Sequence, residues 1–88
     1  MLELYGTKGC PYTMELRESL QWDGEEFVEY DVEEDREALR RLVALTGGRT
    51  VPALVEGERV IQIGVGGRGC MVALPPDMKE TSVYRGGG

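Results

Sequence analysis

The sequence contains no histidine among its 88 residues and only two cysteines, Cys10 and Cys70. The absence of histidine excludes imidazole as a general acid, general base or metal ligand, so any chemistry depends on cysteine, carboxylate, lysine, tyrosine or backbone groups. Two cysteines are too few for the dense disulfide framework of a small secreted protein. In a reducing compartment, a cysteine is more often catalytic or a ligand than a structural crosslink.

Long hydrophobic runs and an excess of basic charge are also lacking. The apolar runs are only a few residues long, and Met1–Tyr5 shows no basic start followed by an apolar stretch. We therefore expect no membrane contact, no signal peptide and a cytoplasmic location. The net charge is −6, with 10 basic residues scattered among 16 acidic ones. Nucleic acid is not an expected partner, because its binding requires clustered positive charge.

The length and the pattern of the first residues predict one small α/β domain. With 88 residues and a hydrophobic content of 41%, the chain lies near the lower limit for burying its own core. Residues 2–5 are an expected strand and residues 6–9 a turn. A helix is then expected to begin at Pro11, because proline is favoured at the first helical position. Cys10 becomes the N-cap of this helix, which should end near residues 22–24.

The following segments continue the alternation of strands and helices. Residues 27–30 are a second expected strand, and Asp31–Glu34 has the Asp-x-x-Glu pattern of a capping box, which predicts a helix start. Gly47-Gly48 should end that helix. Residues 51–55 and 60–63 are expected to form a hairpin. The order β-α-β-α-β-β predicts parallel pairing of the first two strands and antiparallel pairing of the last two.

Beyond residue 63 the regular pattern stops. Glycines crowd residues 64–69, which indicates a loop, and residues 71–74 are a brief apolar piece compatible with one helical turn. Pro75-Pro76 interrupts it. We therefore expect a domain over residues 1–74 and a flexible C-terminal tail over residues 75–88.

Cys10 is the strongest candidate for a reactive residue. A thiolate at a helix N-terminus faces unpaired backbone N–H groups and the positive end of the helix dipole. The amides of Tyr12 and Thr13 should point at the sulfur, the Thr13 hydroxyl can donate to it, and Lys8 adds a nearby positive charge. A buried structural cysteine is the alternative, but a turn-to-helix junction is an unusual place for one. Thr13 is explained equally well as an ordinary first-turn residue, and Lys8 as a solvated loop charge.

The motif Cys10-Pro11-Tyr12-Thr13 resembles the active-site motif of the glutaredoxins, Cys-Pro-Tyr followed by Cys or Ser. The run Gly48-Arg49-Thr50-Val51-Pro52 is similar to the family's segment before its cis-proline. Two motifs at the expected separation are more specific than either alone, and the resemblance covers roughly residues 1–67. It implies a thioredoxin-like α/β fold with a short or missing C-terminal helix. The chain also resembles a group of glutaredoxin-like proteins that can carry selenocysteine at the position of Cys10.

The resemblance implies thiol–disulfide exchange with glutathione as co-substrate and protein disulfides or glutathionylated proteins as partners. Cys10 would attack the disulfide, and a second glutathione would release the adduct. Pro52 would be cis, and the backbone of Val51 would pair with glutathione like an added strand. The glutathione-binding residues implied in this way are Lys8, Tyr12, Arg49, Thr50, Val51 and Pro52.

The sequence departs from the family pattern in three places. Thr13 replaces the second cysteine, residues 64–70 lack the acidic pair that meets the γ-glutamyl end of glutathione, and the C-terminal helix is absent or short. Exchange must therefore be monothiol or use a remote thiol. Cys70 could resolve Cys10 as an internal disulfide if the two Cα atoms approach within about 7 Å, or it could be an inert cysteine.

Two other functions remain open. Cys10 and glutathione could hold an iron–sulfur cluster between two subunits, although Pro11 and Tyr12 argue mildly against it. A thioredoxin-fold binding module without redox chemistry would instead leave the pKa of Cys10 near the free value of about 8.5. We expect a monomer with no metal site of its own.

Overall fold

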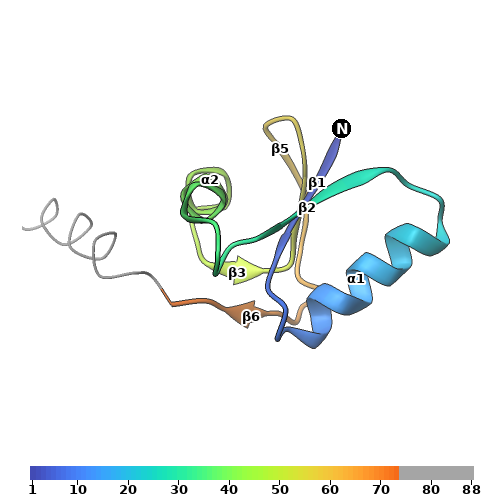
Figure 1. The fold of residues 1–88 in the computed structure, drawn as a ribbon, viewed down its shortest axis with the longest axis horizontal. Coiled ribbons are helices and arrows are strands. Elements are labelled where there is room, and N and C mark those ends of the chain that lie inside the picture. The colour runs from blue at the N-terminus through green and yellow to red at the C-terminus, as the bar shows by residue number, and fades with distance from the viewer. Residues whose placement is uncertain (74–88) are drawn as a thin grey trace, which may run out of the picture.

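A four-stranded sheet forms the centre of the protein in the computed structural model, which describes residues 1–73 (Figure 1). In their order across the sheet, the strands are β2 (Phe27–Asp31), β1 (Leu2–Gly6), β4 (Ala53–Glu56) and β5 (Arg59–Ile63). Two helices, α1 (Pro11–Trp22) and α2 (Arg36–Thr46), lie on opposite sides of this sheet in Figure 1. A second, two-stranded sheet joins β3 (Thr50–Val51) to β6 (Cys70–Met71).

The pairing of the main strands confirms the predicted topology. β1 is parallel to β2, with Leu2 opposite Phe27, and antiparallel to β4, with Leu4 opposite Leu54. β4 and β5 form the expected antiparallel hairpin. The parallel β1–β2 pair requires a crossover, and α1 supplies it.

Alternation along β1 and β4 divides the core between the two faces of the sheet. Leu4 and Leu54 point to one face, because successive side chains of a strand point to opposite sides. They pack there against Leu16 and Leu20 of α1. The opposite face packs against α2 in a larger cluster, whose buried members are Tyr5, Cys10, Val32, Ala38, Leu39, Leu42, Val51, Ala53, Val55 and Val72. Cys10 therefore belongs to a packed environment, although it begins the helix on the other face.

The start of α2 differs from the prediction. The N-cap is Asp35, whose carboxylate accepts a hydrogen bond from the Ala38 amide at 3.1 Å. The predicted capping box at Asp31–Glu34 is wrong, because Asp31 is still paired with Gly6 as the last residue of β2. The Asp31 carboxylate accepts instead from the amide of Glu33, at 3.0 Å, within the turn between strand and helix.

The ends of the two helices lie where the sequence places them. α1 ends at Trp22 and α2 at Thr46. Gly47 follows α2 with a φ of 77°, a left-handed conformation that favours glycine, and its amide donates to the Val43 carbonyl.

The segment after β5 also differs from the prediction. Cys70–Met71 is a strand antiparallel to β3, so the helical turn expected over residues 71–74 is wrong within the described residues. The glycine-rich loop brings the chain back alongside β3, so that β6 pairs with it. The Val72 amide then donates to the Arg49 carbonyl at 3.1 Å. Val72 is 4% exposed. The expected tail over residues 75–88, and with it the question of a C-terminal helix, lies outside the described residues.

Candidate active site

Cys10 begins α1, as predicted. It has the extended backbone conformation of an N-cap (φ −95°, ψ 114°), and its carbonyl accepts the first helical hydrogen bonds, from the amides of Thr13 at 3.1 Å and Met14 at 3.2 Å. Its side chain makes no capping hydrogen bond. A thiolate is a much stronger acceptor than a thiol, so the ionised sulfur can attract the amides of the first turn.

The sulfur of Cys10 lies against the segment before Pro52. Cys10 is only 1% exposed, and its Sγ lies 4.0 Å from the carbonyl oxygen of Val51. The peptide bond between Val51 and Pro52 is cis, as the resemblance implied. Two motifs that are distant in the sequence therefore meet in one place. Tyr12 is partly buried and packs against the same cluster.

Cys70 is the second cysteine at this place. The antiparallel register sets it opposite Val51, whose carbonyl oxygen lies 4.0 Å from the sulfur of Cys10. Both cysteines are free, Cys10 buried and Cys70 partly exposed. The structure thus brings the remote thiol to Cys10 through β6, an element that the sequence did not predict.

The two thiols have opposite pKa shifts. Burial raises the pKa of Cys10, but hydrogen bonds from the Cys70 thiol, the Thr13 hydroxyl and the backbone amides of Thr13 and Tyr12 outweigh it, so the pKa lies below its ordinary value of 9.0. The pKa of Cys70 is raised above 9.0 by its hydrogen bond to Cys10, by burial and by the negative charge of Cys10. Of the two thiols, Cys10 is therefore the one that ionises more readily.

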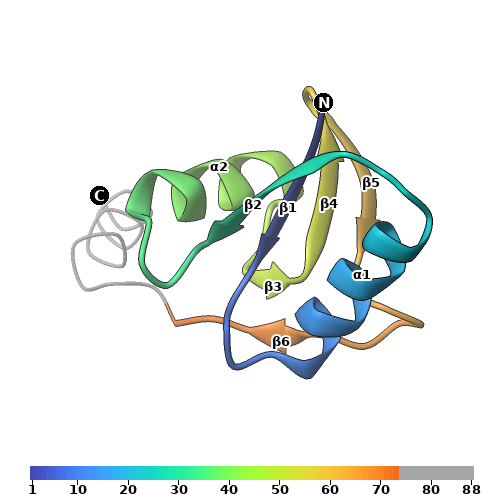
Figure 2. The ribbon, with the colours of Figure 1, turned by 45° about the vertical axis from the view of Figure 1, so that its right-hand side comes forward.

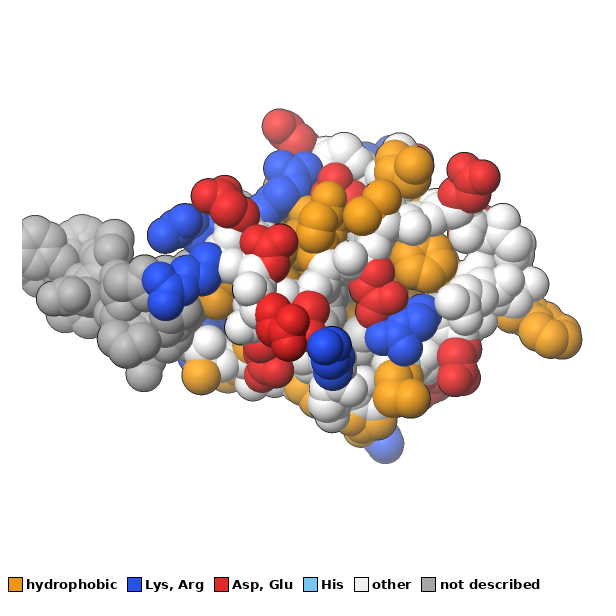
Figure 3. Space-filling model, viewed as in Figure 1, with side chains coloured by type: hydrophobic (Ala, Val, Ile, Leu, Met, Phe, Trp, Pro, Cys, Tyr) orange, Lys and Arg blue, Asp and Glu red, His pale blue; other side chains and the backbone are white. Residues whose placement is uncertain are grey.

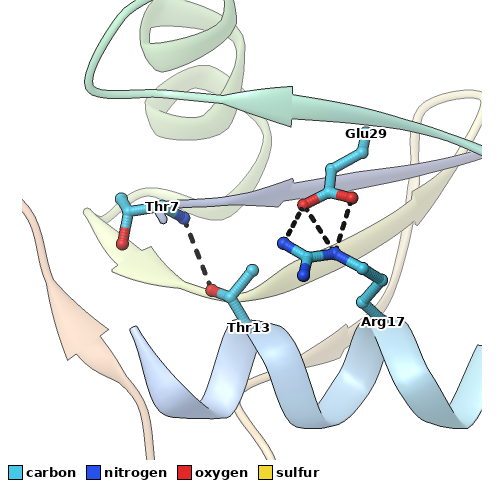
Figure 4. Close-up of polar contacts among 4 residues, drawn as sticks. All are labelled: Thr7, Thr13, Arg17 and Glu29. Carbon is cyan, nitrogen blue, oxygen red and sulfur yellow. Dashed lines mark hydrogen bonds and ion pairs between the residues drawn. The ribbon is translucent and has the colours of Figure 1, made fainter. Parts of the chain in front are cut away.

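Thr13 links the thiolate to the end of β1. Its Oγ1 is buried and accepts a hydrogen bond from the Thr7 amide at 3.4 Å (Figure 4). Because Oγ1 accepts from this side, the hydroxyl proton is free to point to Cys10. From the sequence, a donor role and an ordinary first-turn role of Thr13 were equally acceptable, and no local pattern pointed to Thr7.

An ion pair fixes α1 against the sheet. Arg17 of α1 donates from Nε and Nη2 to the carboxylate of Glu29 on β2, with N–O distances of 2.8 and 2.6 Å (Figure 4). This two-point geometry holds the helix in a defined position relative to β2.

Acidic and basic side chains are interspersed over the face of the molecule seen in Figure 3.

The two basic residues expected to bind glutathione are engaged elsewhere. Lys8 is 77% exposed, with its Nζ 3.5 Å from the carboxylate of Glu34, and it is not among the groups that lower the pKa of Cys10. The guanidinium of Arg49 lies against β6, 3.3 Å from the Val72 carbonyl and 3.5 Å from the sulfur of Met71. The backbone of β3 is paired with β6 as well.

Metal and membrane signals are absent from residues 1–73. No group of three or more candidate metal-ligating side chains occurs among them. None of the helices they form has the length and apolar character needed to span a bilayer.

A cysteine at a helix start, facing a cis-proline at the end of a central sheet, defines a thioredoxin-like protein. Solved structures with this fold include the glutaredoxin of Archaeoglobus fulgidus, with a TM-score of 0.66 and 20% identity, over 74% of this chain and 75% of that one. The thioredoxin-like protein BC3987 has a TM-score of 0.65 and 26% identity, over 69% of this chain and 84% of that one.

The family follows from the sequence comparisons. The family model for glutaredoxin matches residues 2–61, and the chain therefore belongs to the glutaredoxin family. A probable glutaredoxin of Synechocystis sp. is 31% identical over 67 residues, which cover 75% of this chain. The chain spans 58% of the length of that relative.

Proposed function

We propose that this protein is a thiol–disulfide oxidoreductase in which the thiolate of Cys10 attacks disulfides. The observation that carries the proposal is the position of Cys10 at the N-terminus of α1, with its sulfur 4.0 Å from the Val51 carbonyl oxygen beside the cis-proline. Groups of the first helical turn lower the pKa of the thiol there. A thiolate is the attacking species in disulfide exchange, so a lowered pKa increases the fraction of Cys10 that is able to attack. A binding module without redox chemistry would have no need of this shift.

The first step forms a mixed disulfide. The Cys10 thiolate attacks one sulfur of a substrate disulfide, a new bond forms between Cys10 and that sulfur, and the other sulfur leaves as a thiolate. The proposed substrates are protein disulfides and mixed disulfides of proteins with glutathione. No local second cysteine exists, because Thr13 stands where a dithiol motif would have it.

The second step releases the substrate by one of two routes. Cys70, the neighbour of Cys10, loses its proton, attacks the Cys10 sulfur and expels the bound group as a thiolate, which accepts a proton. The product is a Cys10–Cys70 disulfide, which two glutathione molecules reduce while forming glutathione disulfide. Alternatively, one glutathione attacks the mixed disulfide directly. The first route is favoured by the position of Cys70 opposite Val51, because the Val51 carbonyl oxygen lies 4.0 Å from the Cys10 sulfur.

Peptide mapping after reaction with glutathione disulfide tests the proposal. We expect the wild-type protein to lose two hydrogens and to yield a Cys10–Cys70 crosslink. Cys70→Ser should instead carry one glutathione on Cys10, and Cys10→Ser should carry none there. A stable glutathione adduct on Cys10 of the wild-type protein would favour the glutathione route. Unmodified Cys10 in both the wild type and Cys70→Ser would contradict the proposed function.

The iron–sulfur alternative stays a prediction of the sequence. It requires two subunits, each contributing Cys10 and glutathione as ligands. Colour and an iron assay of freshly purified protein test it directly, because a thiol–disulfide oxidoreductase needs no iron.

A further inference from the structure

The strand β6 pairs with β3, the backbone to which the resemblance to the glutaredoxins assigns glutathione. Cys70 is opposite Val51 and Met71 is opposite Thr50, in antiparallel register. In both ribbon views, β6 runs beside β3 and close to the start of α1 (Figures 1 and 2). A strand that binds by pairing with β3 therefore meets an edge that the chain itself has already paired.

The side chains around β6 lead to the same conclusion. Pairing with Val51 brings Cys70 to Cys10, whose sulfur lies 4.0 Å from the Val51 carbonyl oxygen, and this is where the sulfur of a substrate would have to lie. Arg49 is the residue directly before β3. Its guanidinium donates to the Val72 carbonyl and so is occupied by the same segment as the strand. The segment Gly69–Val72 therefore contacts the backbone of β3, the guanidinium of Arg49 and the surroundings of the Cys10 sulfur.

We propose that Gly69–Val72 is a self-docked, substrate-like strand, which presents Cys70 to Cys10 and must leave β3 before an external disulfide can pair there. The proposal rests on the proposed function and adds a regulation of the same site. The site accepts an extended peptide with its cysteine opposite Val51. The reactivity of Cys10 towards external disulfides is then limited by the fraction of molecules in which Gly69–Val72 is undocked.

The docked segment is held weakly enough to leave. β3 and β6 are only two residues long each, and a two-stranded ladder of this size has little stability of its own. Met71 is 68% exposed, so Val72 is the main apolar anchor. Local opening of such an element costs much less than global unfolding.

Gly69 offers a way to displace this segment. A Cβ at Gly69 would lie 2.6 Å from the Val51 carbonyl oxygen and 2.8 Å from Cγ2 of Thr50. The first contact is with backbone, so Gly69→Ala can be accommodated only if β6 moves away from β3. Gly48→Ala is the matched control, because Gly48 precedes β3, the partner strand of β6, and a Cβ there has no atom within 4 Å.

The experiment is done in the Cys70→Ser background, where no internal disulfide can form. The measured quantity is the rate of glutathione adduct formation on Cys10 with glutathione disulfide. We expect Gly69→Ala to raise this rate by about fivefold or more, as the undocked fraction rises, and Gly48→Ala to leave it unchanged. A synthetic peptide with the sequence of residues 68–72, with serine for the cysteine, should slow the reaction of the Gly69→Ala protein, and a scrambled peptide should not.

An equal rate in the Gly69→Ala and Gly48→Ala proteins, with the peptide ineffective, would overturn the proposal. Such a result leaves the proposed function intact, whereas an unreactive Cys10 in every variant overturns both. If Gly69→Ala does not fold, hydrogen exchange at the Val72 amide of the Cys70→Ser protein decides the question. Exchange should accelerate at least about tenfold when Cys10 carries glutathione, and unchanged exchange would overturn the proposal.

Discussion

The N-termini of α1 and α2 offer the same free backbone amides, and the protein uses them differently. α2 begins at Asp35, whose carboxylate accepts from the Ala38 amide, and Glu37 adds negative charge in the first turn. α1 begins at Cys10, makes no side-chain capping bond and has no acidic residue in its first turn. The first arrangement stabilises a helix, and the second leaves the positive end of a helix to a thiol.

This difference shows which contacts stabilise α1. A carboxylate cap typically contributes about 1 kcal/mol, and α1 lacks it. α1 is held instead by tertiary contacts: the burial of Leu16 and Leu20, and the ion pair of Arg17 with Glu29. Because the helix does not depend on its cap, the capping position is available for chemistry.

Substitution of the N-cap residues Cys10 and Asp35 tests this comparison. The larger effect on activity relative to stability is expected at Cys10. We expect Cys10→Ser to abolish disulfide exchange, because a serine hydroxyl does not form a disulfide. The free energy of unfolding should stay the same or rise by up to about 1 kcal/mol, since serine is a good N-cap. A disulfide reduction assay and urea unfolding measure the two quantities. If the Cys10→Ser protein catalyses disulfide exchange faster than buffer alone, the reactive group does not lie at the amides of α1.

The pH dependence of alkylation should distinguish the two cysteines of the wild-type protein. We expect the midpoint for Cys10 below 9.0 and that for Cys70 above it, as peptide mapping after brief iodoacetamide treatment would report. The lowered pKa of Cys10 also stabilises the fold. This contribution is present above pH 9.0 and is lost as the pH falls through the lowered value. A Cys10 midpoint at or above 9.0 would contradict the role assigned to the α1 terminus.

Removing the Thr13 hydroxyl should weaken the thiolate site without removing the thiol. We expect Thr13→Val to raise the pKa of Cys10 and to slow its alkylation at pH 7 by several-fold to about tenfold, because one hydrogen bond to the thiolate is lost. The buried Thr7 amide also loses its acceptor, which should lower the unfolding free energy by about 1–3 kcal/mol. Thr13→Ser is the control that keeps the hydroxyl. Equal alkylation rates for Thr13→Val and Thr13→Ser would argue against the donor role.

At α2, the corresponding change should affect stability alone. Asp35→Ala should lower the free energy of unfolding by about 1 kcal/mol and leave the alkylation rate of Cys10 unchanged. Asp31→Ala, at the start of the capping box expected from the sequence, removes only a turn contact and should cost less than Asp35→Ala. Urea unfolding of both variants measures the difference. A larger loss for Asp31→Ala would contradict the helix start seen in the structure.

The misplaced start of α2 shows the limit of local patterns. Asp31 and Asp35 both have the side chain of a good N-cap, and the Asp-x-x-Glu spacing favours Asp31. Pairing with Gly6 in the parallel ladder of β1 and β2 keeps Asp31 in the strand. A non-local contact therefore selects between two locally acceptable helix starts.

The sequence alone determined the features that depend on neighbouring residues. Pro11 after Cys10 begins a helix and makes the cysteine its cap, and hydrophobic alternation around a tight turn produces the β4–β5 hairpin. Tertiary structure alone decided that Cys70 meets Cys10 and that Arg49 binds β6. The physical reason is that the glycine-rich residues 64–69 have no hydrophobic periodicity to direct the chain. The path of the chain there is set by pairing with Val51 and by burial of Val72, which are contacts between residues far apart in the sequence.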